Sequence, residues 1–419
     1  MTAPVDAPAA VAPPGDRARH FPTLDAARAL AAAAVVATHT AFWTGRSAQG
    51  PFAATLSRLD VGVAIFFVLA GFLLARPWLY ARRWELPRPL VRGYLWRRAL
   101  RILPAYWLVT VVALLAVPDN RGTVGPATWL HHVTLTQIYG LGWQRHALTQ
   151  TWSLATEVAF YLVLPALLVL VLGRGRRWDT GPALIVLGGL AVLAPLWHLA
   201  LPTLGLDPRV AGQWLPGYLA WFAGGIGLAV LEVDGTGTGS RRLVGVGREL
   251  ARSPWVCWGL GLAAFVVATT PLAGPRDLST PTEGAAAVKN VLYLVVAVAF
   301  LLPLTVGHAD GGRVRTLLAS RPMAWLGQRS YGVFLWHLLV LEVVVRLLHQ
   351  ELFTGSWVVT FVLTLAGAVV AAALTYRLLE SPVMRLRSRV PAYPPGASDT
   401  QTATRLTTQR AWDQPEPAA

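Results

Sequence analysis

Long apolar runs recur along this chain, separated by shorter polar segments. Each run holds about 17 to 25 residues, the length that an α-helix needs to cross the hydrocarbon core of a bilayer. The pattern predicts an all-α, polytopic membrane bundle of about ten transmembrane helices. The spans are expected near residues 24–43, 61–79, 102–117, 151–172, 181–200, 215–233, 254–272, 286–306, 330–348 and 357–378, the third being short and extending into its flanks.

Composition indicates the same lipid environment. Of the 419 residues, 54% are hydrophobic and 14% are charged, whereas a soluble domain carries about a quarter charged residues. We therefore expect a multi-pass protein of the cell membrane, with the lipid bilayer as a partner. The membrane domain is expected over residues 24–380, between a tail at 1–23 and a second tail at 381–419. Both tails are predicted to be cytoplasmic and disordered.

The net charge of +15 raises the question of a nucleic-acid partner. Most Lys and Arg residues fall in the two tails and in the loops after the second, fourth, sixth and eighth spans, and few fall in the other loops. This distribution is the positive-inside pattern of membrane proteins. It predicts that both termini lie in the cytoplasm and that the charge does not serve to bind nucleic acid.

Two ionisable residues interrupt the first span, Arg28 and His39. Such groups cost roughly a few kcal/mol in hydrocarbon and tend to mark a working site. Eleven residues of helix make about three turns plus 20°, so both side chains project from one face, ~16 Å apart along the axis. Arg28 lies near the cytoplasmic end, where snorkelling to the interface is the alternative. His39 lies toward the outer side, where a packed, hydrogen-bonded histidine is the alternative.

A carboxylate lies inside the fourth span, at Glu157. This helix is predicted to run inward, which puts Glu157 about two turns below the outer surface, near the depth of His39. A carboxylate within hydrogen-bond reach of an imidazole fixes its tautomer and supports it as a general base. The alternative is a glutamate that caps the start of its helix through Ser153.

The loop after the second span is the most basic of the chain and includes Arg97, Arg98 and Arg101. Arg98 and Arg101 are one helical turn apart and can face the same way. Guanidinium groups suit phosphate oxygens, which predicts a site for a phosphate-bearing cofactor. Because cytoplasmic loops are basic in general, contact with anionic lipid is an equal alternative.

The ninth span carries a second intramembrane histidine, His337, about two turns from the cytoplasmic face. Unlike Arg28, it cannot reach far toward the interface. A histidine bonded to a neighbouring helix and a histidine that contacts a ligand are equally consistent with this position. No set of residues has convincing metal-ligand spacing, so no metal cofactor is expected.

Taken together, these motifs resemble the membrane-bound acyltransferase 3 family over about residues 20–385. Arg28 and His39 match its arginine, ten residues, histidine signature, and Asp25 resembles its acidic lead-in. Other segments are similar to the family's second-helix motif, its paired arginines, its fourth-helix run, its ninth-helix motif and its C-terminal ending: Val61 to Phe72, Arg98 to Arg101, Trp152 to Tyr161, Ser330 to His337, and Glu380 to Pro382.

The resemblance implies an O-acyltransferase. It implies transfer of an acyl group, expected to be acetyl, from a coenzyme A thioester to a hydroxyl of a carbohydrate or glycosylated metabolite. His39 is then the expected general base, with Glu157 and Arg28 as further catalytic residues. The expected donor-binding residues are Arg97, Arg98, Arg101 and Arg28, and the expected substrate-binding residues are Asp25, Trp152, Tyr161, Tyr331 and His337.

Two alternatives concern the mechanism and the function class. The acyl group is expected to pass directly to the acceptor, with relay through His39 itself as the alternative. A proton-coupled secondary transporter is the competing class, in which Arg28, His39 and Glu157 form a proton and anion pathway. The sequence has no inverted repeat and no paired, glycine-interrupted half-helices, which disfavours a transporter. The acceptor, its membrane face, the acyl chain length and the oligomeric state are left open, a homo-oligomer included.

Overall fold

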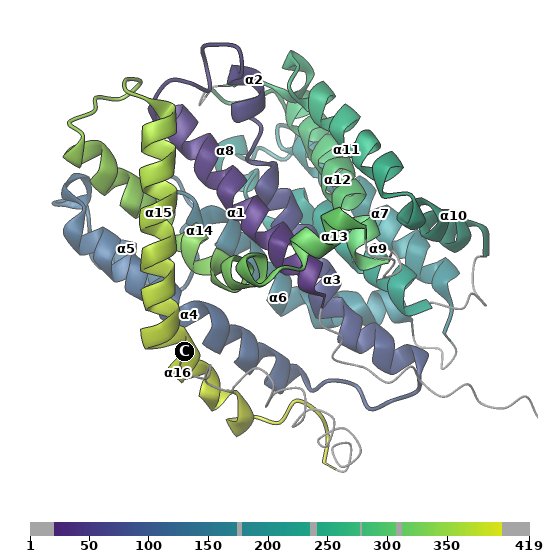
Figure 1. The fold of residues 1–419 in the computed structure, drawn as a ribbon. Helices are drawn as coiled ribbons and strands as arrows, with labels where there is room; N and C mark the ends of the chain where they lie inside the picture. Colours follow the sequence, from purple (N-terminus) through teal and green to yellow (C-terminus); the bar gives the residue numbers. More distant parts are fainter. Residues whose placement is uncertain (1–20, 174–177, 235–240, 277–278, 307–311, 396–419) are drawn as a thin grey trace, which may run out of the picture.

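The computed structural model describes residues 21–173, 178–234, 241–276, 279–306 and 312–395. Within these ranges the chain forms helices joined by turns, with no strand (Figure 1). The all-α fold class predicted from the apolar runs is confirmed. Of the two predicted tails, residues 1–20 and 396–419 lie outside the described residues.

A helix occupies each stretch that the apolar runs mark. The long helices are α1 (Pro22–Trp43), α3 (Val61–Arg83), α4 (Val91–Ala116), α6 (Thr151–Leu172), α7 (Thr180–Ala200), α9 (Leu219–Asp234), α11 (Pro254–Ala268), α12 (Glu283–Thr305), α14 (Arg321–Leu347) and α15 (Trp357–Thr375). Shorter α-helices lie between them, and a last one follows α15: α2 (Ala53–Leu56), α5 (Pro126–Val133), α8 (Pro208–Ala211), α10 (Arg241–Arg252), α13 (Arg313–Leu318) and, last, α16 (Ser381–Met384).

Eight helical segments of the described chain are long and apolar enough to cross a membrane. A ninth is added if the pair Val244–Arg252 and Pro254–Ala268, bent by 97°, forms one span. α1 is not among them, although its 22 residues reach about 33 Å. Asp25, Arg28 and His39 lower its mean hydropathy. The count of about ten spans and the cytoplasmic position of both termini therefore stay predictions.

α3 forms the centre of the bundle. In its most apolar 18-residue stretch 78% of the residues are buried, against 22% for α7 at the rim. A glycine lets α9 approach it closely, because a Cβ on Gly71 would lie 2.2 Å from the Phe222 carbonyl oxygen. The Phe222 ring stacks with Phe67 and Phe160, at centroid distances of 4.5 and 3.9 Å. Small residues and stacked rings are what hold helices together in lipid, where the hydrophobic effect does not drive their association.

α1 and α14 cross the middle of the molecule and run in the same direction (Figure 1). Near the start of both helices, a Cβ on Gly327 would lie 2.2 Å from the Asp25 carbonyl oxygen. Farther along both helices, His337 contacts His39. The order of the two contacts shows that the helices are parallel. Asp25 of α1 therefore lies level with Gly327 of α14, and His39 lies level with His337.

α4 begins earlier than the sequence predicts, at Val91 instead of near residue 102. Arg97, Arg98 and Arg101 therefore lie on a helix and not in the loop before it. The helix starts directly after Pro87 and Pro89, in a segment that has no helical structure. A proline disfavours helical geometry in the residue before it, which explains why the helix begins at this point.

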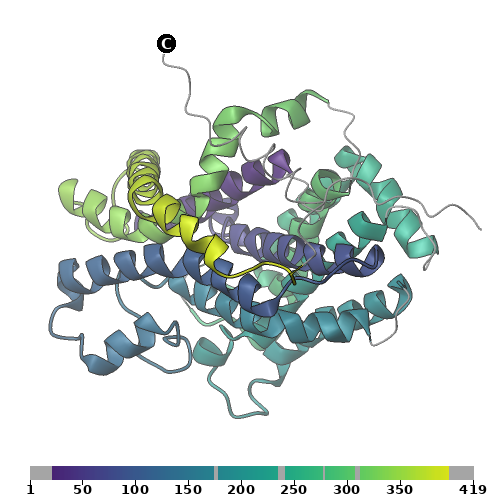
Figure 2. The ribbon, with the colours of Figure 1, turned by 90° about the horizontal axis from the view of Figure 1, so that it is seen from below.

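The segment Ser381–Arg389, assigned by sequence to the C-terminal tail, is also helical. It forms α16 and the short helix η5 (Arg385–Arg389), which lie along α4 (Figure 2). The Trp96 indole N–H on α4 donates to the Leu386 carbonyl oxygen at 3.0 Å. Contacts with α4 thus fix residues whose composition alone resembles a tail.

Candidate active site

His39 and His337 meet inside the bundle. His39 lies on α1 and is partly exposed, whereas His337 lies on α14 and is fully buried. His39 Nδ1 lies 3.1 Å from His337 Nε2, and His337 Nδ1 lies 2.6 Å from the Phe334 carbonyl oxygen one turn earlier. His337 is therefore bonded to a neighbouring helix, one of the two roles left open for it. We call His39 and His337 the histidine pair.

The hydrogen-bond partners fix the tautomers of the pair. A carbonyl oxygen only accepts, so His337 Nδ1 carries the hydrogen that bonds to Phe334. In a neutral ring His337 Nε2 then accepts, and His39 Nδ1 donates to it. The lone pair of His39 Nε2 is then left without a hydrogen-bond donor among the described residues. The Phe334 carbonyl thus acts on His39 through His337. Val35, one turn earlier on α1, is a second backbone hydrogen-bond partner of His39.

Glu157 belongs to a different part of the site. It lies on α6, where the Tyr161 hydroxyl one turn along donates to its carboxylate. Its carboxylate is in electrostatic range of Arg98 and Arg28. Among the described residues, no hydrogen bond or ion pair joins Glu157 to His39. The structure gives His39 a histidine partner where the sequence predicts a carboxylate.

The depth at which α6 begins explains this difference. The sequence places the start of the fourth span at the outer surface. In the structure Gln150, which precedes α6, donates from its side-chain amide to the Leu335 carbonyl oxygen at 2.9 Å, two residues from His337. α6 therefore starts beside the histidine pair, inside the bundle. Glu157, about two turns farther along, lies below His39 and nearer to the arginines.

Three arginines gather at one end of the bundle: Arg28 from α1, and Arg98 and Arg101 from α4. We call these three the arginine cluster. Arg28 donates to the Asp25 carboxylate at 3.1 Å, three residues earlier on the same helix. The Asp25 side chain is 7% exposed and that of Arg28 is 35% exposed. Asp25 therefore orients Arg28, and the guanidinium stays partly exposed.

Arg101 and Arg98 differ in their partners. Arg101 donates to the Glu380 carboxylate at 2.8 Å and to the Gln328 carbonyl oxygen at 3.0 Å. Glu380 ends the short helix η4 (Tyr376–Glu380), and its side chain is 2% exposed. Arg98 Nε is buried and has no hydrogen-bond partner among the described residues. An orphaned guanidinium N–H beside two further arginines fits an anionic group of a ligand.

The other residues singled out by sequence take mixed positions. The Tyr331 hydroxyl donates to the Ile102 carbonyl oxygen at 2.8 Å, so it braces α14 against α4. Trp152, in the first turn of α6, packs on Tyr218 with 5.1 Å between ring centroids. Arg97 is partly exposed on α4, next to Arg98. Tyr161 bonds to Glu157 and thereby joins the surroundings of the arginine cluster.

Two residues of the site were not identified from the sequence. Glu380 appeared in a C-terminal motif without a role, yet it is the ion-pair partner of Arg101. Asp60 precedes α3, lies in electrostatic range of His39, and binds Lys289 at 2.6 Å and the Tyr293 hydroxyl. An acidic residue at the edge of an apolar run was the only available signal for each. Among the described residues, no three His, Cys, Asp or Glu side chains are close enough to hold a metal ion.

Comparison with known proteins places this geometry in context. The peptidoglycan O-acetyltransferase OatA of Listeria monocytogenes is 25% identical over 387 residues, 88% of this chain and 56% of the relative. Nodulation protein 10 of Rhizobium leguminosarum is 25% identical over 397 residues, 89% of this chain and 96% of the relative. The acyltransferase MdmB of Streptomyces mycarofaciens is 26% identical over 404 residues, 89% of this chain and 94% of the relative.

The chain thus spans little more than half of the Listeria relative and nearly all of the other two. No solved structure matches it. A family model described as "Acyltransferase domain" matches residues 21–377, which hold both the histidine pair and the arginine cluster. This chain therefore belongs to that acyltransferase family, the acyltransferase 3 family that its motifs resemble.

Proposed function

We propose that this protein is an O-acyltransferase of the cell membrane that uses His39 as the general base. The acyl group, acetyl in the first instance, passes from a coenzyme A thioester to a hydroxyl of a carbohydrate or glycosylated metabolite. The observation that carries the proposal is the chain from the Phe334 carbonyl through His337 to His39, which leaves His39 Nε2 free. A proton acceptor at the end of a fixed relay is what transfer to a hydroxyl needs.

The proposed step has three parts. His39 Nε2 takes the proton of the acceptor hydroxyl while the hydroxyl oxygen attacks the thioester carbonyl carbon. The new C–O bond forms, the C–S bond breaks, and the protonated His39 gives its proton to the leaving thiolate, which restores the neutral base. The positive charge on His39 is shared with His337 through the 3.1 Å hydrogen bond. The Asp60 carboxylate lies in electrostatic range of His39.

The arginine cluster supports the choice of donor. Coenzyme A carries phosphates, and the orphaned Nε of Arg98 offers a buried donor for one of them. Arg28 lies on the same face of α1 as His39, about 16 Å away along the helix axis. A phosphate-bearing head held by Arg98 and Arg28 would leave the long pantetheine arm to reach along α1. The donor supplies the activated acyl group, and the chain supplies the base and the anchors.

The relatives support a carbohydrate acceptor. One bears the name of a peptidoglycan O-acetyltransferase, and another, 27% identical over 348 residues, is the exopolysaccharide production protein ExoZ of Rhizobium meliloti. Carbohydrates present many hydroxyl groups and lack a stronger nucleophile, which fits a site built around one base. A transporter is not favoured, because the family to which the chain belongs is one of acyltransferases.

Mass spectrometry tests the proposal. Envelope glycans and secreted metabolites are compared from cells with the intact gene, without it, and with a His39→Gln version. We expect an O-acyl group that appears with the intact gene and is missing from the other two samples. Western blotting of membranes confirms that the His39→Gln protein is made. Identical O-acylation in all three samples would remove the proposed activity.

A further inference from the structure

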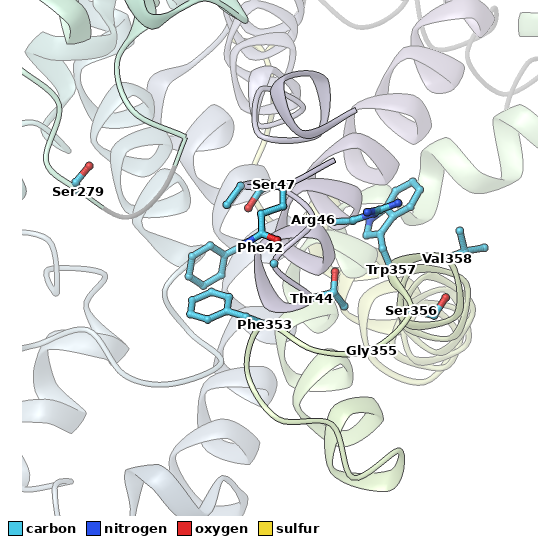
Figure 3. Close-up of a pocket in the computed structure, with 13 residues that line it drawn as sticks. Phe42, Thr44, Arg46, Ser47, Ser279, Phe353, Gly355, Ser356, Trp357 and Val358 are labelled. Atoms are coloured by element: carbon cyan, nitrogen blue, oxygen red, sulfur yellow. The ribbon is translucent and has the colours of Figure 1, made fainter. Parts of the chain in front are cut away.

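A cavity of about 770 Å³ lies at the end of the bundle where α1 terminates (Figure 3). Its walls are the last turn of α1 with the segment after it, the segment that joins α14 to α15 with the start of α15, and Ser279 from the segment before α12. The volume is within the range of about 300 to 1,000 Å³ typical of small-molecule sites. Of the helices that line this cavity, α1 carries His39, and the loop in its wall follows α14, the helix that carries His337.

The cavity begins within one turn of His39. Phe42, in its wall, follows His39 by three residues on α1, a rise of ~4.5 Å and a rotation that leaves both side chains on neighbouring faces. Trp357, also in the wall, donates its indole N–H to the Ala37 carbonyl oxygen at 3.3 Å. The wall therefore touches α1 both just before and just after His39. Arg28 lies toward the opposite end of the same helix.

The lining combines aromatic rings with hydrogen-bonding groups. The rings of Phe42 and Phe353 face each other edge to face, with 5.6 Å between centroids (Figure 3). Phe353 has a φ of +66°, unusual for a bulky residue, and its N–H donates to the Trp43 carbonyl oxygen at 2.7 Å. That bond pins the α14–α15 segment on the end of α1. The ring is therefore presented to the cavity by a fixed backbone.

Polar groups complete the wall. Arg46 and Ser356 are exposed in this wall, whereas Thr44 and Ser47 are buried beneath it and the Thr44 hydroxyl donates to the Thr40 carbonyl oxygen at 2.9 Å. An aromatic face packs against the C–H face of a sugar ring, while hydroxyl and guanidinium groups bond to the sugar hydroxyls. A purely lipid-filled groove would need neither an exposed arginine nor an exposed serine hydroxyl.

We propose that this cavity binds the sugar of the acceptor. The acceptor hydroxyl then reaches His39 from the end of α1 opposite the arginine cluster, so the two substrates approach one base from two ends of the bundle. This inference rests on the proposed acyltransferase function and adds the place and chemistry of the acceptor site. The binding surface consists of Phe42, Phe353 and Trp357 as ring faces, with Arg46 as the charged donor.

The test separates acceptor binding from donor binding. Phe353→Asn removes the ring and keeps a residue that tolerates positive φ, and Arg46→Gln removes the charge. Phe52→Ala is the control, because Phe52 is 68% exposed in the loop before α2 and is not part of the cavity. Two quantities are measured for each variant: the dissociation constant of acetyl coenzyme A, by calorimetry on purified protein, and the O-acylated carbohydrate formed in cells.

We expect product formation by the Phe353→Asn, Arg46→Gln double variant to fall by about tenfold or more. Tenfold is the loss expected for one charge-assisted hydrogen bond. Its donor affinity and the output of the Phe52→Ala control should stay unchanged. Wild-type product levels in the double variant would overturn the assignment of the cavity. Loss of donor affinity in that variant would overturn it too, by pointing to a general structural defect. Absence of product even with the intact gene would overturn the proposed function and this inference with it.

A second measurement is independent of side-chain truncation. Ser356→Cys places a thiol in the cavity wall, and the native Cys257 is buried. Labelling with a bulky maleimide should abolish product formation and leave acetyl coenzyme A binding intact. The same label on Thr203→Cys, in the exposed loop after α7, should have no effect. A labelled Ser356→Cys protein with full output would contradict an acceptor in this cavity.

Discussion

Within the part of the chain that the structure describes, every ring nitrogen of the histidine pair but His39 Nε2 has a partner, whereas a buried guanidinium nitrogen of the arginine cluster has none. In the pair, the Phe334 carbonyl orients His337, His337 orients His39, and His39 Nε2 keeps its lone pair. The cluster is ordered at its edges, where Asp25 holds Arg28 and Glu380 holds Arg101, and is left open at Arg98. One centre is complete before any ligand arrives, and the other needs an anion to complete it.

This difference indicates that the histidine pair and the arginine cluster have different roles in the reaction. A preorganised base contributes to the rate, because its geometry needs no rearrangement during the reaction. An incompletely satisfied cationic site contributes to affinity, because the ligand supplies the missing hydrogen bonds. Changes in the pair should therefore appear in turnover, and changes at Arg98 should appear in donor binding.

The largest effect is expected at His39. His39→Ala removes the base, and His39→Gln keeps a hydrogen-bonding group without basicity. Both should lower the turnover number by about 10² to 10⁴, the usual contribution of general-base catalysis. The measurement is acetyl transfer by purified protein, with acetyl coenzyme A affinity as the control for folding. Turnover within a few-fold of wild type would exclude His39 as the base.

The next largest effect is expected at His337, which acts through His39. His337→Ala removes the acceptor for His39 Nδ1–H and should lower turnover roughly 10-fold to 100-fold without a change in donor affinity. His337→Gln places a carbonyl oxygen at the end of a side chain of similar reach, and we expect it to restore part of that loss. If Ala and Gln reduce turnover equally, the relay is not what His337 provides.

The arginines should separate binding from stability. Arg98→Ala should weaken acetyl coenzyme A binding by about tenfold, the loss of a charge-assisted hydrogen bond of ~1.5 to 3 kcal/mol. Arg101→Ala leaves the buried Glu380 carboxylate unpaired and should instead lower the melting temperature of the protein. Arg92→Ala, at an exposed position of α4, is the control. Equal effects of Arg98→Ala and Arg92→Ala on affinity would return Arg98 to a general role in contact with anionic lipid.

Glu157 sharpens the same comparison. Since its carboxylate is bonded to Tyr161 and lies near the arginines, Glu157→Gln should reduce turnover less than His337→Ala does. A fall in turnover of less than about tenfold agrees with a role of Glu157 beside the donor. Larger falls in turnover are expected only when a group bonded to the base is changed. A fall as deep as that of His39→Gln would restore the role predicted from sequence, in which Glu157 supports the base directly. Both variants are assayed under one set of conditions.

The smallest effect concerns pH and a histidine outside the membrane spans. Burial, the largest cause, lowers the pKa of His132 on α5 to about 4. Because the unfolded value is about 6.5, the folded state takes up fewer protons between these values. This contribution to stability is complete above pH 6.5 and is lost as the pH falls toward 4. The melting temperature of wild type should drop more between pH 7.5 and 4.5 than that of His132→Gln, and equal drops would contradict the assignment.

Features that lie within a single helix could be predicted from the sequence. The long apolar runs located the helices, and the spacing of Arg28 and His39 follows from helix geometry alone. The depth of Glu157 in the bundle could not be predicted, because it depends on where α6 begins. Nothing in the apolar pattern indicates that α6 begins beside Leu335. The contact of His39 with a residue 298 positions away is likewise a property of α1 and α14 packed in parallel.

The tautomer of His39 tests the central claim most directly. Solid-state NMR of ¹⁵N-histidine-labelled protein in lipid distinguishes a protonated Nδ1 from a protonated Nε2, and the His39→Gln and His337→Gln variants assign the two signals. We predict that neutral His39 and neutral His337 both carry their hydrogen on Nδ1, with His39 Nε2 unprotonated and available as the base. A hydrogen on His39 Nε2 in the neutral protein would contradict the relay and the mechanism built on it.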